Sequence, residues 1–340
     1  MANPGRWGWG NLLKGRRVLV TGAGGFIGSH LIERLVRTGA TVRAFVRYNS
    51  RQDRGSLRYV DPQVLSAVEV VAGDLRDGQA VEKAMDGVAF AFHLGAIISI
   101  PYSYTNPDEV VGVNVMGTLN VLNAARRHEV ECLVHTSTSE VYGTARYVPI
   151  DEAHPLQGQS PYSASKIGAD KLVESFWCAY GLPVVTIRPF NTYGPRQSTR
   201  AVIPTIITQA LKADRIDLGN LEATRDFTFV SDTVEAFVKA VERPEARGQT
   251  VNLGTGREIS IAQLCQMICR IVGGEIPVVV DKQRLRPAGS EVGRLLARND
   301  LSAEVLGWTP VVSLEEGMAR TVDWIRAHLA DYPEADHYVI

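Results

Sequence analysis

Long apolar runs are missing from this sequence. A helix that crosses a membrane needs roughly 18 consecutive apolar residues, and no segment comes near that length. The N-terminal segment MANPGRWGWGNLLKGRR also lacks the successive basic, apolar and small-residue regions of a secretory signal peptide. We therefore expect no membrane partner and a cytoplasmic location.

Cysteine is scarce, with four residues in 340. Cys132, Cys178, Cys265 and Cys269 show neither a CxxC spacing nor the density of a disulfide-stabilised secreted domain. Cys265 and Cys269 lie four apart in an apparent helix, a spacing that suits a metal ion, but no histidine or acidic partner is near them. We expect reduced, partly buried thiols and no metal site.

Net charge is almost absent as well. Lys and Arg number 36 against 37 Asp and Glu, which leaves a formal charge of -1. No field over the whole surface therefore attracts nucleic acid or an anionic membrane, and an anionic ligand must be met by a local cluster. The composition, 45% hydrophobic and 21% charged, is that of an ordinary globular protein, and 340 residues predict two domains or one domain with a large added lobe.

Short apolar segments alternate with longer amphipathic ones along the first part of the chain. The apolar segments have the length of strands, and the amphipathic ones have helical periodicity. We expect strands at 17–23, 41–47, 68–74, 88–96, 131–139 and 182–190, and helices at 26–39, 78–87, 110–128 and 163–180. This alternation predicts an α/β fold: a Rossmann-type, doubly wound parallel sheet with helices on both faces.

The alternation breaks after Phe190. A helix at 203–213 and a pair of strands between 217 and 230 follow, and the segments 231–242 and 249–256 look like a return to the first domain. We therefore expect a first domain at 15–190, joined by 230–258, and a smaller C-terminal α/β lobe made of 191–229 and 259–330. Ligands of open parallel sheets bind at the carboxyl ends of the strands, so the motifs there carry the function.

A glycine-rich turn joins the first strand to the first helix. In VLVTGAGGFIGSHL, Gly22, Gly25 and Gly28 have the spacing G-x-x-G-x-x-G. Glycines permit the tight turn, let the backbone approach a pyrophosphate and let the helix pack on the sheet with its N-terminal amides facing the anion. The setting between a strand and a helix indicates a dinucleotide cofactor of the NAD(P) class.

The end of the second strand bears on which dinucleotide binds. The usual NAD site has a carboxylate there, which holds the ribose hydroxyls. Here the segment FVRYNSR contains no acid, and Arg47, with Arg51, suits a 2′-phosphate. We expect NADP to be favoured over NAD; the alternative is that Arg47 stacks on adenine or faces solvent. Asp74 and Leu75, after the third strand, are placed to flank adenine, although Asp74 is equally suited to cap a helix.

Tyr162 and Lys166 lie four residues apart at the start of a predicted helix, so their side chains share one face. An ammonium beside the phenol, together with an oxidised nicotinamide, favours phenolate and lowers the pKa of Tyr162 from about 10 toward the working pH. Tyr162 then serves as a general base. The alternative is an exposed helix pair, but the upstream dinucleotide turn favours the catalytic interpretation.

With these motifs in place, the chain resembles an extended short-chain dehydrogenase/reductase that acts on nucleotide sugars. The similarity runs from about Arg17 to Leu329, through TGAGGFIG, HLGA at 93–96, Asn114, TSTSEVYG, YSASK, RPFNTYGP, RDFTFVSD and LGWTP. The resemblance implies that Thr138 hydrogen-bonds the sugar hydroxyl that is oxidised. It also implies that the cofactor is bound by Gly22, Gly25, Phe26, Ile27, Gly28, Arg47, Asp74, Leu75, Leu94, Ala96, Tyr162 and Lys166.

The segment Thr138-Ser139-Glu140 discriminates within this family. It most resembles GDP-mannose 4,6-dehydratases and the N-acetylglucosamine nucleotide 4,6-dehydratases of the legionaminic acid pathway, whereas 4-epimerases commonly carry small or apolar residues there. The resemblance implies a catalytic set of Thr138, Ser139, Glu140, Tyr162 and Lys166. Because Ser139 is not a strong acid, Glu140 must both remove the proton on carbon 5 and assist the departure of hydroxide.

The implied reaction converts an NDP-hexose, with NDP-N-acetylglucosamine among the candidates, to the 4-keto-6-deoxy sugar by internal hydride transfer. The protein is then an NAD(P)-dependent lyase. The first alternative is an NDP-sugar 4-epimerase acting on a hexose or hexuronate. From a different class, the alternative is a non-catalytic dinucleotide-binding regulator on the same fold.

The diphosphate of such a substrate needs cations, which this near-neutral chain must supply locally. Arg225 and Arg286 match family positions that bind the diphosphate. Asn191 is expected to bond the sugar or phosphate, and Arg196 is a further substrate-binding candidate. For each arginine the alternative is a surface ion pair.

His93 and His135 lie at apolar strand ends, where we expect core histidines with satisfied hydrogen bonds.

The helices near 110–127 and 163–180 carry broad apolar faces. Members of the family pair these helices across a two-fold axis as a four-helix bundle, so the resemblance implies a homodimer.

Overall fold

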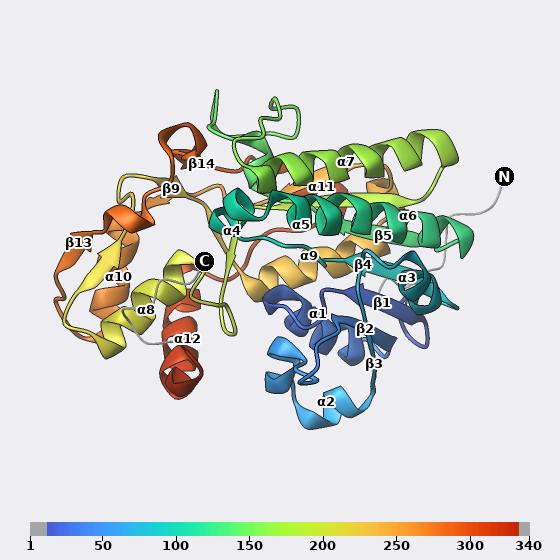
Figure 1. Cartoon of the computed structure of the whole chain (residues 1–340), viewed down its shortest axis with the longest axis horizontal. Coiled ribbons are helices and arrows are strands. Elements are labelled where there is room, and N and C mark those ends of the chain that lie inside the picture. The colour runs from blue at the N-terminus through green and yellow to red at the C-terminus, as the bar shows by residue number, and fades with distance from the viewer. Residues whose placement is uncertain (1–11, 333–340) are drawn as a thin grey trace.

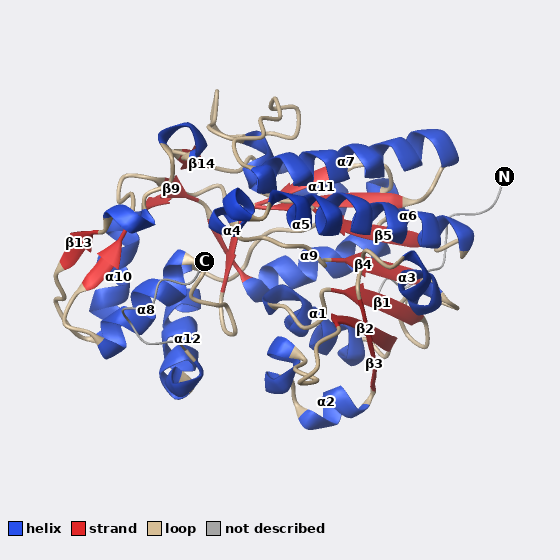
Figure 2. Ribbon diagram, viewed as in Figure 1, coloured by secondary structure: helices blue, strands red, loops and turns tan. Residues whose placement is uncertain are grey.

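A parallel sheet of seven strands forms the centre of the protein, whose computed structural model describes residues 12–332 (Figures 1 and 2). The strands are β1 (Arg17–Thr21), β2 (Thr41–Arg47), β3 (Val68–Gly73), β4 (Phe90–His93), β5 (Cys132–Thr136), β6 (Val184–Pro189) and β11 (Thr250–Leu253). Their order is β11-β6-β5-β4-β1-β2-β3. The predicted Rossmann-type sheet is confirmed, and its order reverses between β1 and β4, where such folds bind ligands.

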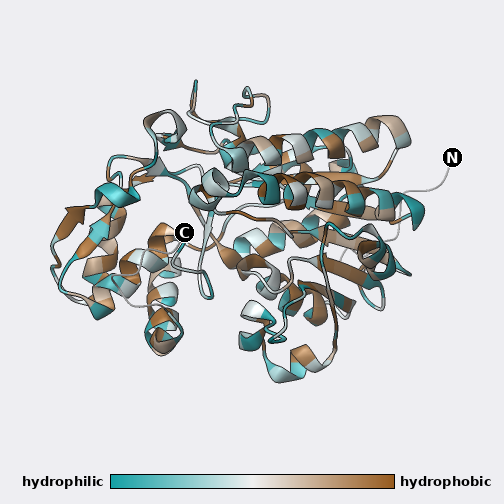
Figure 3. Ribbon diagram, in the orientation of Figure 1, coloured by the Kyte–Doolittle hydropathy of each residue, from teal (hydrophilic) through white to brown (hydrophobic). Residues whose placement is uncertain are grey.

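Helices cover both faces of the sheet, and each face has its own apolar core. One core joins α1 and α9 to the sheet and continues into the smaller lobe, and the other joins α3, α6 and α7 to it. The helices concerned are α1 (Phe26–Arg37), α2 (Pro62–Ser66), α3 (Gly78–Met85), α4 (Ile100–Thr105), α5 (Pro107–Val111), α6 (Gly117–Arg127), α7 (Pro161–Tyr180) and α9 (Val230–Glu242). Apolar residues gather on the central strands and on the helix faces turned toward them (Figure 3).

The helix expected at 110–128 is longer than the sequence indicated and is not uniform. It begins at Pro107 as α5, passes through a π-helical turn at Gly112–Met116 and continues as α6 to Arg127. Asn114 lies in the π-helical turn, where its side chain bonds both the amide and the carbonyl of Ile97. The extra residue in the turn therefore lets the helix reach back to the loop after β4.

The chain returns to the sheet after building the first part of the smaller lobe, residues 191–229. α9 packs against α1, and β11 pairs in parallel with β6, with Thr250 opposite Thr186. β11 therefore lies at the edge of the sheet beyond β6, although residues 191–229 of the smaller lobe and α9 separate the two strands in sequence.

Three helices and three short sheets build the smaller lobe. The helices are α8 (Val202–Lys212), α10 (Ile261–Val272) and α12 (Leu314–Ala327), and α11 (Asp300–Leu306) lies beside β11. The sheets pair β7 (Asn191–Tyr193) with β10 (Phe227–Phe229), β8 (Ile216–Leu218) with β13 (Val278–Val280), and β9 (Thr224–Arg225) with β12 (Ile259–Ser260) and β14 (Arg294–Leu295).

The strand pair that we expected between 217 and 230 is wrong. Strands form there, but β8, β9 and β10 each pair with a partner from another part of the chain. They are only two or three residues long, and the apolar side chains of β8 and β10 are buried in the helical core of the lobe. Packing against distant elements therefore decides their pairing, and local alternation does not.

Between residues 12 and 332, no helix combines the length and the apolar character that crossing a bilayer requires. Within the same range, no group of three or more histidine, cysteine or acidic side chains is arranged to hold a metal ion. The four cysteines are free, with Cys178 exposed and the other three buried. The expectation that the chain has no signal peptide falls mostly on residues 1–11, outside the described residues.

Candidate active site

The glycine turn between β1 and α1 is shaped for the close approach of other backbone and of a ligand. Gly22 has a φ of +68°, and a Cβ there would lie 2.7 Å from the nitrogen of Gly95. A Cβ at Gly28 would collide with the carbonyl oxygen of Gly22. Gly25 precedes α1 and supplies no side-chain cap to its first amides. These amides, at the positive end of the helix dipole, fit the pyrophosphate of a dinucleotide.

Two cavities adjoin this turn. The larger, of about 690 Å³, is lined among others by Gly25, Phe26, Arg47, Ala96 and Arg196. The smaller, of about 160 Å³, is lined among others by Gly22, Arg47, Asp74, Leu75 and Ala96. Ile27 and Leu94 instead pack against the apolar core. The structure thus gathers most of the cofactor-binding candidates around two neighbouring spaces that share Arg47 and Ala96, and the cradle at Gly22 and the uncapped amides of α1 fit a dinucleotide.

Arg47 and Asp74 both have protein partners in this region. Arg47 is largely exposed, and its Nη2 lies 3.3 Å from Oε1 of Glu109. The side-chain hydrogen bond from Arg76 is the main cause of the lowered pKa of Asp74. The alternative role of Asp74 as an N-cap is wrong, because Asp77 caps α3. Asp74 instead begins a turn in which its carbonyl accepts from the amide of Asp77, so the helix starts later.

Arg196 is separated from the other substrate-binding candidates. Its Nη2 lies 2.9 Å from Oε1 of Glu33 on α1 and also donates to the carbonyl of Tyr59. Its φ of +72° is unusual for a residue with a Cβ and turns the chain toward α1. Arg196 therefore ties the loop after β7 to the cofactor side of the molecule.

Tyr162 and Lys166 lie on the first turns of α7 and are both buried. Ser160 caps this helix by accepting from the amide of Ser163, and its own amide donates to the Ser163 hydroxyl. Nζ of Lys166 donates to the carbonyl of Thr136, at the end of β5, over 2.7 Å. The helix start thus places both side chains at the carboxyl ends of the central strands.

Burial is the main cause of the pKa shifts of this pair. It raises the pKa of Tyr162, while a hydrogen bond with Thr138 lowers it. Burial also lowers the pKa of Lys166 to about 8, against a raising effect of Asp170. The protein groups alone therefore do not lower the pKa of Tyr162 as we expected, because desolvation of the phenolate dominates and the ammonium bonds to Thr136.

Thr138 connects Tyr162 to the segment that carries Glu140. Its Oγ1 accepts a hydrogen bond from the amide of Glu140 over 3.2 Å and thereby caps the short 3₁₀ turn Ser139–Tyr142. The hydroxyl proton of Thr138 thus remains available to donate toward Tyr162 or a ligand. Ser139 is buried and is not among the residues that line the neighbouring cavity, whereas Glu140 is.

That cavity, of about 270 Å³, brings together Glu140 and most of the substrate-binding candidates. It is lined among others by Glu140, Asn191, Arg225, Arg286 and Glu291. The guanidinium of Arg225 donates to the carbonyls of Thr224, Val292 and Gly293, so it also holds the chain near Val292 over the cavity. Nη1 of Arg286 is buried and has no hydrogen-bond partner among the described residues, which leaves it for an anion.

Sequence reasoning missed two charged residues behind this site, Asp170 and Arg188. Asp170 lies one helical turn after Lys166, and Arg188 lies within the apolar strand β6. Arg188 Nη2 is 3.0 Å from Oδ2 of Asp170, and both side chains are almost fully buried. An arginine within an apolar strand segment was the signal, since a buried guanidinium requires a buried partner.

His93 and His135 are both buried at the ends of central strands. Nδ1 of His93 is hydrogen-bonded to Thr21 and Nε2 to Thr118, as expected of a satisfied core histidine. Nε2 of His135 contacts Asp170, but its Nδ1 is without a partner among the described residues. Burial is the largest cause of the lowered pKa of both rings.

Comparisons with a family model and with individual proteins point to the same family. Residues 19–321 match the family model described as GDP-mannose 4,6 dehydratase. A UDP-glucose 4-epimerase of Mycolicibacterium smegmatis is 37% identical over 317 residues, which are 91% of this chain and 98% of the relative. A dTDP-D-glucose 4,6-dehydratase of Mus musculus is 32% identical over 333 residues, which are 94% of this chain and 92% of the relative.

A solved structure agrees in fold over almost the whole chain. The dTDP-glucose 4,6-dehydratase of Streptomyces venezuelae, with NAD bound, superimposes with a TM-score of 0.83 and 29% identity. The match covers 93% of this chain and 98% of that one. Similar proteins therefore include both dehydratases and epimerases of nucleotide sugars.

Proposed function

The chain belongs to the GDP-mannose 4,6 dehydratase family of nucleotide-sugar dehydratases and epimerases, and within it we propose that the protein is a nucleotide-sugar 4,6-dehydratase. Its substrate is an NDP-hexose, with NDP-N-acetylglucosamine among the candidates, and its product is the 4-keto-6-deoxy sugar. The observation that carries the proposal is Glu140, a carboxylate that lines the cavity of Arg225 and Arg286 and whose amide bonds to Thr138.

The roles of the residues follow from their positions. Tyr162 takes the proton of the 4-hydroxyl while Thr138 donates a hydrogen bond to the same group, and Lys166 supplies positive charge beside them. A nicotinamide cofactor held at the turn of Gly22, Gly25 and Gly28 would supply the redox chemistry, as a reversible acceptor of hydride from the sugar. Glu140 removes the proton of carbon 5, which the ketone at carbon 4 acidifies. The same proton then leaves with the 6-hydroxyl as water. After hydride has been returned to carbon 6, carbon 5 takes a proton from solvent and Tyr162 releases the proton of the 4-hydroxyl to solvent, so Glu140 and Tyr162 both end in their starting states.

A 4-epimerase is the second candidate, because an epimerase is among the relatives with high identity. Epimerisation uses Tyr162, Lys166 and Thr138 in the same way, but it needs no base at carbon 5. Glu140 would then have no chemical role.

A panel of UDP-, GDP- and dTDP-linked hexoses, N-acetylhexosamines and hexuronates tests the proposal. Loss of one water with formation of a 4-keto-6-deoxy sugar, seen by mass spectrometry and NMR, supports the dehydratase. A C4 epimer without loss of water establishes the epimerase instead. Binding of the nucleotide sugars without turnover identifies a regulator.

We expect NADP, more than NAD, to be released when the purified protein is denatured. Arg47 lines both cofactor cavities, and β2, which ends at Arg47, contains no acidic residue. A charge-assisted contact with a 2′-phosphate contributes about 1.5–3 kcal/mol, so Arg47→Ala should weaken NADP binding about 10- to 100-fold and leave NAD binding unchanged. Mass spectrometry of the released nucleotide and titration of both cofactors measure this.

Arg37→Ala, at the far end of α1, is the matched control for Arg47. If the wild-type protein releases only NAD, Arg47 serves its ion pair with Glu109 and not a phosphate.

We expect a homodimer in solution. Val111 on α5, Met116 in the π-helical turn and Tyr180 on α7 are 44%, 50% and 56% exposed, although each is a large apolar or aromatic side chain. Pairing of α5, α6 and α7 with a second copy would bury them. Light scattering should give about twice the chain mass of 37.2 kDa, and a stable monomer at micromolar concentration contradicts the expectation.

A further inference from the structure

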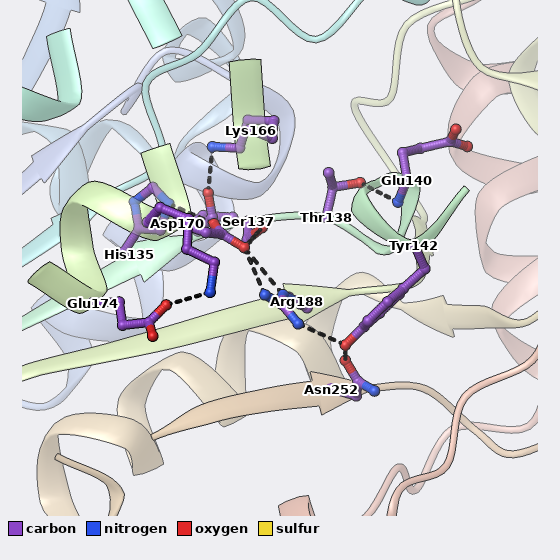
Figure 4. Close-up of polar contacts among 12 residues, drawn as sticks. His135, Ser137, Thr138, Glu140, Tyr142, Lys166, Asp170, Glu174, Arg188 and Asn252 are labelled. Atoms are coloured by element: carbon purple, nitrogen blue, oxygen red, sulfur yellow. Dashed lines mark hydrogen bonds and ion pairs between the residues drawn. The ribbon is translucent and has the colours of Figure 1, made fainter. Parts of the chain in front are cut away.

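A buried carboxylate lies directly behind the candidate catalytic residues. Asp170 is one turn along α7 from Lys166 and is 5% exposed. Its Oδ2 accepts from the hydroxyl of Ser137 over 2.8 Å and from Nε and Nη2 of Arg188 over 3.1 and 3.0 Å (Figure 4). Its Oδ1 lies 3.3 Å from Nε2 of His135. One side chain thus joins α7 to β5, to β6 and to the residue before Thr138.

The hydrogen bonds continue from Arg188 to the far end of the Glu140 segment. Nη1 of Arg188 donates to the hydroxyl of Tyr142 over 2.9 Å, and that hydroxyl donates to Oδ1 of Asn252 on β11 over 2.7 Å (Figure 4). Ser137 and Tyr142 stand on either side of the segment 138–141. The cluster therefore holds both ends of the segment that carries Thr138 and Glu140.

The charges around Lys166 give Asp170 a second effect. Lys166 is buried, and within the described part of the chain its Nζ bonds to the carbonyl of Thr136 and to no carboxylate. Asp170 is the group whose charge raises the pKa of Lys166 against burial, and its charge also raises the pKa of Tyr162. The other titratable or charged groups that face this cluster are His93 on β4, His135 on β5, Arg188 on β6, Glu140 and Tyr142 in the 3₁₀ turn, and Glu152, whose charge acts on Arg188 and Tyr142.

We propose that Asp170 is a positioning residue for the reaction, which fixes the segment from Ser137 to Tyr142 and keeps the buried Lys166 in its ammonium form. The inference rests on the proposed function only in taking Tyr162 and Lys166 as the catalytic pair. It applies equally to a dehydratase and to an epimerase, because both begin with oxidation at carbon 4.

If the ion pair between Asp170 and Arg188 serves only to stabilise the fold, a different result is expected. Replacing Asp170 alone leaves the guanidinium of Arg188 buried without its counter-charge, which destabilises any protein. The double variant Asp170→Asn/Arg188→Gln removes both charges and restores electrical balance. If the pair is only structural, this variant should recover activity together with stability.

We expect the double variant to recover the unfolding temperature and its content of bound nucleotide but not its activity. Its kcat should fall about 10- to 100-fold, with KM changed much less, because misplaced reacting groups cost rates of that order. Loss of the Asp170 charge lowers the pKa of both Lys166 and Tyr162, so the optimum of kcat should move to lower pH. Wild-type kcat with an unchanged optimum overturns the proposal.

Two further measurements keep the test decisive. Asp232→Asn is the matched control, since this buried carboxylate accepts from the amides of Val311 and Val312 in the smaller lobe, and its pH optimum should stay unchanged. If the double variant does not fold, Ser137→Ala removes only the hydroxyl that donates to Asp170. It should lower kcat about tenfold while lowering the unfolding temperature by only a few degrees. An unchanged kcat in Ser137→Ala overturns the positioning role.

The pH dependence of the ¹³Cε chemical shift of Lys166, read by NMR of lysine-labelled protein, requires neither turnover nor access of a reagent to this buried amine. In the double variant its midpoint should lie below that of the wild type, and an equal midpoint overturns the proposal. If the wild type turns over no nucleotide sugar, the proposed function fails while this measurement still decides the role of Asp170.

Discussion

Replacing Tyr162 by Phe should lower the rate of sugar oxidation by about 10²- to 10⁴-fold, the usual contribution of a general acid or base. The phenyl ring fills the same buried volume beside Thr138, so the fold should survive. Among residues 12–332, the other group that hydrogen-bonds to the Thr138 side chain is the amide of Glu140, a donor that cannot replace the phenol oxygen. Stopped-flow absorbance of reduced nicotinamide and the yield of keto sugar measure the loss.

Tyr193→Phe is the matched control for this prediction. Tyr193 is also buried, and its hydroxyl donates to the carbonyl of Leu314 in the smaller lobe. Its deletion should cost about 1 kcal/mol of folding stability and leave the oxidation step unchanged. If Tyr162→Phe oxidises the sugar within tenfold of the wild-type rate, Tyr162 is not the base.

The wild-type pH profile should fall on both sides. Proton removal by Tyr162 becomes faster as pH rises toward its pKa, which burial raises. As pH rises through about 8, Lys166 loses its proton and the charge that stabilises a phenolate disappears. The alkaline decline should therefore begin near pH 8.

Replacing Glu140 by Gln should separate oxidation from elimination. Gln keeps the size and the backbone hydrogen bond to Thr138 but cannot remove a proton, so dehydration should fall by about 10²- to 10⁴-fold. Tyr162, Lys166 and Thr138 are unchanged, so reduced nicotinamide should still form with substrate. In deuterated water, deuterium should no longer enter at carbon 5.

Glu291→Gln provides the matched control, because Glu291 lines the same cavity as Glu140. We expect it to change KM and to leave deuterium entry at carbon 5 intact. Near wild-type formation of the 4-keto-6-deoxy sugar by Glu140→Gln removes this residue from the mechanism. A wild type that interconverts C4 epimers and never loses water removes the dehydratase.

The sequence was most informative where structure depends on neighbouring residues. The alternation of strands and helices, the turn at Gly22 and the end of α7 at Gly181, whose φ is +64°, follow from local patterns. The shared face of Tyr162 and Lys166 follows from helical spacing alone.

Contacts between distant residues lay beyond those patterns. β9 pairs with β12 and β14, and no alternation of a two-residue strand specifies such partners. Arg196 was named from the sequence as a further substrate-binding candidate, but its ion pair with Glu33 of α1 could not be predicted from its own segment. In the sequence, Asp170 resembles any polar residue of a helix. Only the fold places Arg188 of β6 against it. Burial of charge is a property of the assembled fold, and single-segment patterns do not contain it.

β11 is synthesised well after β6, the strand with which it pairs, and this order affects the folding of the nascent chain. Until residues 250–253 leave the ribosome, β6 presents an open row of backbone amides and carbonyls, which can recruit strands from other chains. Nascent or truncated chains that end after Phe190 therefore have an unpaired sheet edge at β6, which can pair with strands of other chains. Expression of the N-terminal part alone should favour aggregation, and chaperone demand should drop once β11 has docked.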